Sequence, residues 1–242
     1  YLRVSTVDYA LNESGTETKF VFKYDATAPA NVSMGFGTIT TNSIAVTGSG
    51  TDPHSGISAT TGYNYSRTGS ADSGWTGSSH VWTGLAANTE YTGLLVTVRD
   101  QVVPTPNTAG STAQSQWTLS IPPGNGSVTP DVSNPCVGDS VTWTAVGGFG
   151  AGGVQYYRYA WDQSATHTFD GSEAVWSSGT IAEAASAAGA WYLHVQGFNA
   201  ADVPNGTYDY SITAQGCAPP AITGAVSRKI HGTAGPFDID IM

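Results

Sequence analysis

A short pattern that occurs three times along the chain constrains its fold more than any other feature. The pattern is Leu, one residue, Val, three residues and then Asp or Asn, and its copies span residues 2–8, 94–100 and 193–199. Neighbouring copies lie roughly 100 residues apart, which is a common size for one protein domain. Such a period predicts similar domains in tandem rather than one large core.

Each copy is followed by a second segment in which apolar and polar residues alternate, which is typical of a half-buried β-strand. These segments cover residues 20–24, 117–121 and 208–212. Each leads into a junction that contains proline, at Pro29, Pro122 and Pro219. Proline ends a strand because it has no N–H to donate to a neighbouring strand. The junctions therefore mark the expected ends of the repeats.

The front halves of the two complete repeats also match each other. Residues 42–47 align with residues 139–144, and residues 63–65 align with residues 157–159. Glycine, serine and asparagine turns separate these short alternating segments. Several short strands with regular turn signals are the sequence signature of a β-sandwich. The sequence therefore predicts an all-β fold with sandwiches arranged one after another.

The repeats divide the chain into four parts. We expect the C-terminal strands of a preceding repeat, a first complete domain, a second complete domain and the start of a further β module, over residues 1–25, 26–121, 122–218 and 219–242. Because the chain starts and stops within alternating segments, we expect it to be a piece of a longer polypeptide. The alanine-rich residues 181–188 are expected to form at most one or two helical turns.

The first complete repeat carries Leu85, then Thr89 four residues on, then Tyr91 two further. This segment resembles the fibronectin type III pattern, with Ala87 in the place of the usual proline. The resemblance implies that Tyr91 opens strand F, with its ring in the core. It also implies that the tyrosine hydroxyl bonds to nearby backbone at the corner between strands E and F.

Two other segments resemble bacterial Ig-like surface repeats. Residues 8–14 look like the Asp-x-Ala-Gly-Asn-x-Ser turn of those repeats, with Leu11 in the place of glycine. Residues 191–195 are similar to their strand F, although the second repeat has no Leu–Thr–Tyr corner. Together the resemblances imply tandem Ig-like or fibronectin type III-like β-sandwiches in a linear array, from a large secreted or cell-surface protein.

Only two cysteines occur, Cys136 and Cys217, and they bracket the second repeat. In a sandwich of the implied topology, strand B starts at the pole where strand G finishes, so the two residues are expected to form a disulfide. In the chain-entropy model, a loop of this length contributes on the order of 4–5 kcal/mol. A persistent disulfide indicates an oxidising, extracellular location. Two reduced, buried thiols are the alternative.

The charge balance excludes some partners. Eight Lys and Arg residues against eighteen Asp and Glu give a net charge of −10, and no basic stripe is present to follow a phosphate backbone. We therefore expect no nucleic-acid partner. No apolar run is long enough to span a bilayer. The expected partners are neighbouring repeats or subunits of the same protein, with a cell-surface glycan as a further candidate.

The sequence shows no catalytic motif. It lacks a His-Glu-x-x-His pair, a serine flanked by glycines two residues away on each side, and a glycine loop with lysine for phosphate. We therefore expect no catalytic residues and predict a non-catalytic spacer, adhesion or assembly segment of a large bacterial surface or secreted protein. The alternatives are a carbohydrate-binding accessory region of an exported polysaccharide-degrading enzyme and a filament subunit assembled by strand donation.

Two groups of residues are candidate binding sites. Tyr156, Trp161 and Trp191 belong to an aromatic-rich region whose flat side chains could stack on a sugar, although such stripes are more often sandwich core. Asp25, Asp52 and Asp100 lie near the expected domain ends, where carboxylates could hold calcium. Solvated turn residues are the alternative for the aspartates. No other cofactor is expected.

Overall fold

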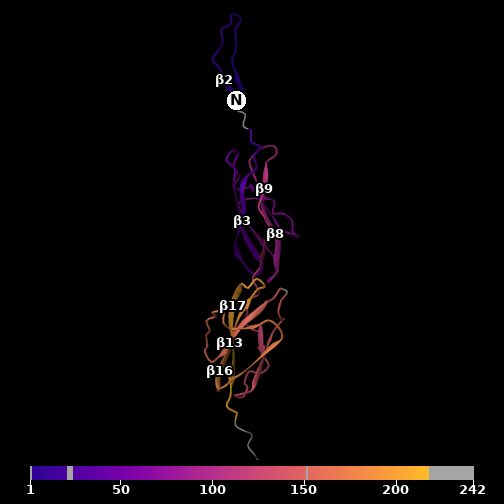
Figure 1. Cartoon of the computed structure of the whole chain (residues 1–242), viewed down its shortest axis with the longest axis vertical. Coiled ribbons are helices and arrows are strands. Elements are labelled where there is room, and N and C mark those ends of the chain that lie inside the picture. Colours follow the sequence, from indigo (N-terminus) through magenta and orange to yellow (C-terminus); the bar gives the residue numbers. More distant parts are fainter. Residues whose placement is uncertain (1, 21–23, 151, 218–242) are drawn as a thin grey trace, which may run out of the picture.

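The structure is a computed structural model, and it describes residues 2–20, 24–150 and 152–217. These residues form β-strands and no helix, so the described part of the chain has no helix that could cross a membrane. Figure 1 shows an N-terminal hairpin followed by two sandwiches along the long axis of the molecule.

The N-terminal hairpin pairs strand β1 (Leu2–Val4) with strand β2 (Glu17–Phe20) in antiparallel fashion. Asp8 organises the connecting turn, because its Oδ1 atom accepts hydrogen bonds from the backbone N–H groups of Ala10 and Asn12. Leu11 adopts a φ of 65°, the left-handed conformation that favours glycine. This is the position at which the resembling turn carries glycine.

The first sandwich consists of two antiparallel sheets. One sheet has the order β3-β4-β7, with strands β3 (Ala30–Ile39), β4 (Ser43–Thr51) and β7 (Ser79–Thr83). The other sheet has the order β10-β8-β5-β6, and β9 pairs with β8 as well. The strands of this sheet are β5 (Tyr63–Ser66), β6 (Trp75–Thr76), β8 (Glu90–Arg99), β9 (Thr108–Gly110) and β10 (Gln114–Trp117). Apolar residues at alternate positions of these strands fill the space between the sheets.

The second sandwich repeats this plan. Its three-stranded sheet has the order β11-β12-β15, with strands β11 (Val128–Pro130), β12 (Ser140–Ala145) and β15 (Thr180–Ala184). Its four-stranded sheet has the order β14-β13-β16-β17, with strands β13 (Tyr156–Asp162), β14 (Ala174–Trp176), β16 (Gly189–Phe198) and β17 (Pro204–Ala214). The predicted fold class, all-β with tandem sandwiches, is confirmed.

The repeated sequence pattern has the same structural role in the two sandwiches, and its last residue has the same role in all three copies. Leu94 and Val96 of β8 and Leu193 and Val195 of β16 are all fully buried at equivalent places in the two cores. The final Asp or Asn of each copy accepts a hydrogen bond from the backbone N–H two residues later, in the pairs Asp8–Ala10, Asp100–Val102 and Asn199–Ala201. The pattern therefore encodes a strand together with the turn that ends it.

The alanine-rich residues 181–188, for which at most one or two helical turns were expected, form no helix. Their first half belongs to strand β15 (Thr180–Ala184), which pairs antiparallel with β12. Burial alternates along this strand. Ile181 packs against the core and Glu183 is partly buried, whereas Ala182 and Ala184 are exposed. Burial of one face of the strand outweighs the helix propensity of alanine.

Candidate functional site

Three side chains that could hold a metal ion meet at the N-terminal end of the first sandwich. They are Asp25, on the segment that leads into β3, and Asp52 and His54, in the loop that follows β4. One potential ligand atom from each side chain lies within 4.8 Å of the other two. The fold therefore brings together residues that are far apart in the sequence.

Backbone N–H groups hold one oxygen of each carboxylate. Oδ1 of Asp52 accepts from His54 and Ser55 at 2.9 Å and from Gly56 at 3.1 Å, while Oδ1 of Asp25 accepts from Thr27 at 2.9 Å. The Thr27 bond, and after it the nearby hydroxyl of Ser55, lowers the pKa of Asp25. Burial acts to raise the pKa of Asp52, but its N–H donors outweigh burial and the pKa is lowered. Both carboxylates are thus ionised at neutral pH.

The second oxygen of each carboxylate is different. Oδ2 of Asp25 and Oδ2 of Asp52 are both buried, and neither has a hydrogen-bond partner among the residues that the structure describes. A buried carboxylate oxygen without a partner is costly, since it has lost water and gained no donor. These two oxygens are therefore suited to a ligand that supplies positive charge.

Asp100, which the sequence grouped with Asp25 and Asp52, does not belong to the group of ligand atoms that converge within 4.8 Å. Asp100 is 2% exposed, and its Oδ1 accepts from the backbone N–H groups of Val102 and Asn107 at 3.1 and 2.9 Å. Its Oδ2 accepts from the side chain of Asn107 at 2.6 Å. Because both oxygens are occupied, Asp100 orders the loop between β8 and β9. The third member of the cluster is His54 instead of Asp100, and the sequence had not pointed to this histidine.

The aromatic residues considered for glycan stacking are packed against other parts of the protein. Trp161 and Trp191 stack on each other with ring centroids 5.3 Å apart, and Trp191 is buried. Tyr156 stacks on Phe198 at 4.7 Å and donates its hydroxyl to Asp202 at 3.2 Å. A sugar face needs an open ring. Trp191 belongs to the core of the second sandwich and Trp161 packs against it, as expected if these aromatic residues serve the core and not a sugar.

The corner residues of the first repeat lie where the loop before β8 joins that strand, with Leu85 and Thr89 in the loop and Tyr91 in β8. The hydroxyl oxygen of Tyr91 accepts a hydrogen bond from the backbone N–H of Ala86 at 2.8 Å, and Leu85 is buried in the core. Thr89 donates its hydroxyl to the carbonyl of Ala87 at 2.8 Å. The ring of Tyr91 is half-buried against the core rather than fully enclosed.

The two cysteines form the disulfide that the sequence predicted. Cys136 and Cys217 are bonded, with Cα atoms 5.4 Å apart and a sequence separation of 81. An isolated bridge between Cys136 and Gln215 places the segment before β12 beside the end of β17. The bond therefore closes one pole of the second sandwich, and that prediction is confirmed.

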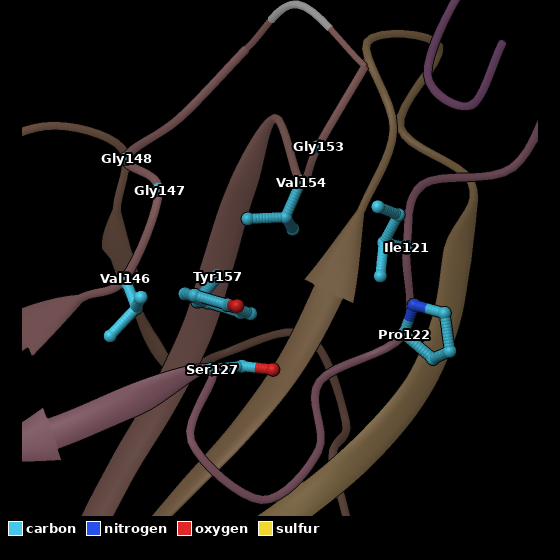
Figure 2. A pocket seen from close by; sticks show the side chains of 9 residues that line it. All are labelled: Ile121, Pro122, Ser127, Val146, Gly147, Gly148, Gly153, Val154 and Tyr157. Atoms are coloured by element: carbon cyan, nitrogen blue, oxygen red, sulfur yellow. The ribbon is translucent and has the colours of Figure 1, made fainter.

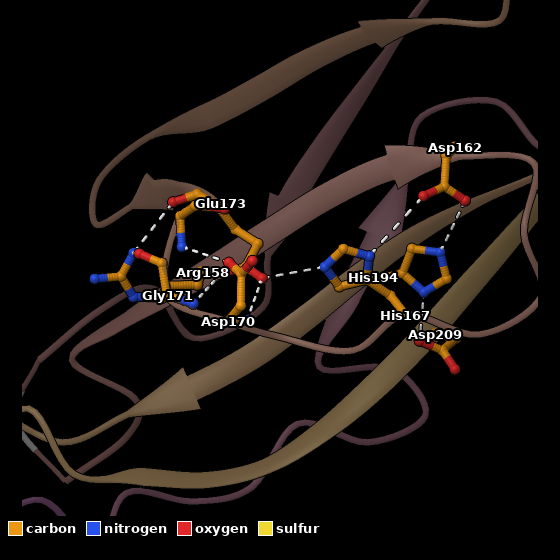
Figure 3. A network of polar contacts seen from close by, with 9 residues as sticks. Arg158, Asp162, His167, Asp170, Gly171, Glu173, His194 and Asp209 are labelled. Carbon is orange, nitrogen blue, oxygen red and sulfur yellow. Dashed lines mark hydrogen bonds and ion pairs between the residues drawn. The ribbon is translucent and has the colours of Figure 1, made fainter.

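A histidine–carboxylate network lies on the face of the four-stranded sheet (Figure 3). His194 is fully buried, with Nδ1 2.6 Å from Oδ1 of Asp209 and Nε2 3.4 Å from Oδ1 of Asp162. His167 stacks on it, with ring centroids 5.3 Å apart, and contacts Glu173 at 3.2 Å. No hydroxyl or thiol among the described residues bonds to either imidazole, so the network joins strands and a loop and forms no nucleophilic triad.

A small cavity of about 190 Å³ opens beside the junction of the two sandwiches (Figure 2). Apolar and small residues line it: Ile121, Pro122, Ser127, Val146, Gly147, Gly148, Gly153, Val154 and Tyr157. Tyr157 is its one titratable side chain, and burial raises the pKa of that phenol. Among the lining residues, only Ser127 and Tyr157 carry polar side chains, and neither is an acid or base that titrates near neutral pH.

Hydrogen bonds join the two sandwiches at the same junction. Asn88 precedes β8 in the first sandwich, and its Oδ1 accepts from the backbone N–H of Ala200 at 2.7 Å. In the other direction, Nδ2 of Asn199 donates to the carbonyl of Thr118 at 2.9 Å, and Nδ2 of Asn205 donates to that of Ser120. The Asn199 bond is fully buried and the bonds of Asn88 and Asn205 are partly buried, so water competes less for them than for exposed hydrogen bonds.

No family model matches the chain, and no curated protein matches it. Among solved structures, it is similar to the FN1–FN3 domains of chicken CNTN1, with 16% identity, 78% of this chain and 67% of that chain covered, and a TM-score of 0.29. It is also similar to the fibronectin(III)-like modules of CbhA from Clostridium thermocellum, with 11% identity, coverage of 81% and 93%, and a TM-score of 0.31. At these TM-scores the fold assignment rests on the strand order alone.

Proposed function

We propose that the chain is a non-catalytic structural segment of an extracellular protein, in which the two sandwiches act together as a rigid spacer. The observation that carries this proposal is the buried junction. Asn88, Asn199 and Asn205 each bond across it, and two of the bonds go to carbonyl groups of the segment that links the domains. A flexible linker would leave these backbone groups to water.

Two further observations support the proposal. The Cys136–Cys217 disulfide suits an oxidising environment outside the cytoplasm. The imidazoles of His167 and His194 contact carboxylates, and Tyr157 is the one titratable side chain among the residues that line the junction cavity. In this role the partners are the neighbouring repeats or subunits of the same protein. Adhesion, strand donation and glycan binding stay predictions.

Small-angle X-ray scattering of the chain tests the rigid junction. The test variant combines Asn88→Gly, which keeps the left-handed φ of 44° accessible, with Asn205→Ala. We expect the wild type to scatter as one elongated body and the double variant to show a broader distribution of interatomic distances. The control is Asn134→Ala, which removes an exposed side chain of the second sandwich. Equal flexibility in the wild type and the double variant would contradict the proposal.

A further inference from the structure

We propose that Asp25, Asp52 and His54 bind a divalent cation that fastens the segment leading into β3 to the loop that follows β4. The site is independent of the spacer role, because it depends only on the first sandwich and the segment that precedes it. Three observations carry the proposal: the convergence of the three side chains, two buried oxygens without partners, and the charge of the cluster.

The convergence is specific in space. The three potential ligand atoms lie within 4.8 Å of one another, although Asp25 and Asp52 belong to different segments of the chain. An ion bound at two to three ångströms from each donor fits a group of this size with small side-chain adjustments. His54 is exposed, so its ring can turn toward the two carboxylates without disturbing the core.

The unpartnered oxygens give the second argument. Each aspartate uses Oδ1 for backbone N–H groups, and this fixes the orientation of the carboxylate. Each leaves Oδ2 buried without a hydrogen bond from the described residues. An oriented carboxylate with one free, desolvated oxygen is the form in which carboxylates bind metal ions in proteins.

The charge of the cluster gives the third argument. Two ionised carboxylates at this separation repel each other, and the charge of Asp25 acts to raise the pKa of Asp52. In the part of the chain that the structure describes, no lysine or arginine forms an ion pair with either aspartate. A cation between the two Oδ2 atoms would replace repulsion with attraction.

The donor set selects the kind of cation. Ca²⁺ takes six to eight oxygen ligands, whereas Zn²⁺ accepts imidazole nitrogen together with carboxylate oxygen and, with three protein ligands, leaves its fourth position to water. Because the third member is His54 and not Asp100, we expect Zn²⁺ rather than the calcium considered from the sequence. Asp25 and His54 also line a cavity of about 640 Å³, which leaves room for the bound water.

Isothermal titration of the untagged, chelator-treated chain with Zn²⁺ and, separately, with Ca²⁺ tests the proposal. We expect one Zn²⁺ per chain and at least about tenfold weaker binding in Asp25→Asn, Asp52→Asn and His54→Ala. The control is Asp72→Asn, an aspartate elsewhere in the first sandwich that bonds to Asn64. NMR should show the imidazole signals of His54 shifting on Zn²⁺ addition.

Three results would overturn the proposal. The first is the absence of Zn²⁺ binding by the wild type. The second is unchanged Zn²⁺ affinity in the two aspartate variants, which would place the ion elsewhere. The third is tight Ca²⁺ binding that His54→Ala does not affect, since His54 would then not be a ligand. Circular dichroism of each variant checks that loss of binding does not come from unfolding.

Discussion

The carboxamide oxygen of Asn88 in the first sandwich lies 2.7 Å from the backbone nitrogen of Ala200 in the second. Asn88 is 4% exposed, so the acceptor side of this bond between domains is shielded from water although Ala200 itself is exposed. Asn88 also has a φ of 44°, which asparagine tolerates better than most residues other than glycine. Asparagine therefore suits this position in two ways: its side chain bonds to the second sandwich, and its backbone tolerates the left-handed conformation.

Replacement of Asn199 by alanine should destabilise the protein. Its side chain donates to Thr118 and accepts from the N–H groups of Ala201 and Val203, and all three partners would lose a bond. We expect the free energy of unfolding to fall by about 2–4 kcal/mol in urea denaturation. Asn134→Ala, at an exposed position, should change it by no more than about 0.5 kcal/mol. Equal effects of the two substitutions would contradict this account.

Replacement of Tyr91 by phenylalanine tests the corner of the first sandwich. The substitution removes the oxygen that accepts the N–H of Ala86 and keeps the ring. The expected loss is about 0.5–1.5 kcal/mol in the free energy of unfolding. The matched control is Tyr9→Phe, since Tyr9 is fully exposed and should be neutral. A neutral Tyr91→Phe variant would show that the hydroxyl contributes nothing to the corner.

Replacement of Leu11 by glycine should stabilise the turn of the N-terminal hairpin. Leucine at a φ of 65° carries backbone strain of about 1–2 kcal/mol, and glycine relieves it at an entropic cost of about 0.5–1 kcal/mol. We expect slower amide exchange at Ser14, whose N–H donates to the carbonyl of Thr6. Leu11→Ala is the control, because alanine keeps the strain and should bring no such slowing.

Reduction of the disulfide should affect one domain and not the other. Without the Cys136–Cys217 bond, the unfolded second sandwich gains chain entropy, and its stability should fall by about 4–5 kcal/mol. The first sandwich contains no cysteine and acts as an internal control. The stability of each sandwich can be measured by urea denaturation of single-domain variants, with and without reductant, followed by tryptophan fluorescence. Equal loss in the two domains would contradict the prediction.

Acid should release the loop between β13 and β14. Burial acts to raise the pKa of Glu173, but hydrogen bonds that include the N–H groups of Asp170 and Gly171 outweigh it, so the pKa is lowered. A lowered pKa in the folded state means that the ionised form stabilises the fold. This stability is present above the unfolded pKa of about 4.3 and is lost as the pH falls through the folded value.

Amide exchange at Asp170 and Gly171, followed from pH 6 downward by NMR, checks this prediction. Protection beyond the intrinsic pH dependence of exchange should fall in acid. In Glu173→Gln, it should be low at every pH, because the charged acceptor is absent. Protection that stays constant in the wild type through pH 3 would show that Glu173 does not hold the loop.

The sequence was sufficient to predict the fold because the repeated pattern joins two local signals. Alternating Leu and Val at positions such as 94 and 96 place one strand face in a core, and the Asp or Asn that follows ends the strand with a backbone hydrogen bond. Both signals act within a few residues, so they can be recognised without a structure. The strand in the alanine-rich segment could not be recognised in this way, because its pairing with β12 is a long-range contact.

The candidate metal site was only partly predictable for the same physical reason. Asp52 and Asp100 both follow a strand, so composition and position do not distinguish them. The difference lies in the loop backbone: the loop after Asp100 turns back so that Asn107 binds both carboxylate oxygens, whereas the loop after Asp52 engages only one. In the sequence, His54 stands next to Asp52 alone, because the other carboxylate of the cluster, that of Asp25, lies far away along the chain.

The disulfide also determines how the chain responds to a pulling force. Tension applied at the two ends of the chain passes from Cys136 directly to Cys217 through the covalent bond and does not load the 80 residues between them. Strands β12 to β17 of the second sandwich are therefore protected from mechanical unfolding, while the first sandwich has no such bypass. Under increasing load, extension of this segment would come from the N-terminal hairpin, the first sandwich and the residues up to Cys136, which all lie outside the closed loop.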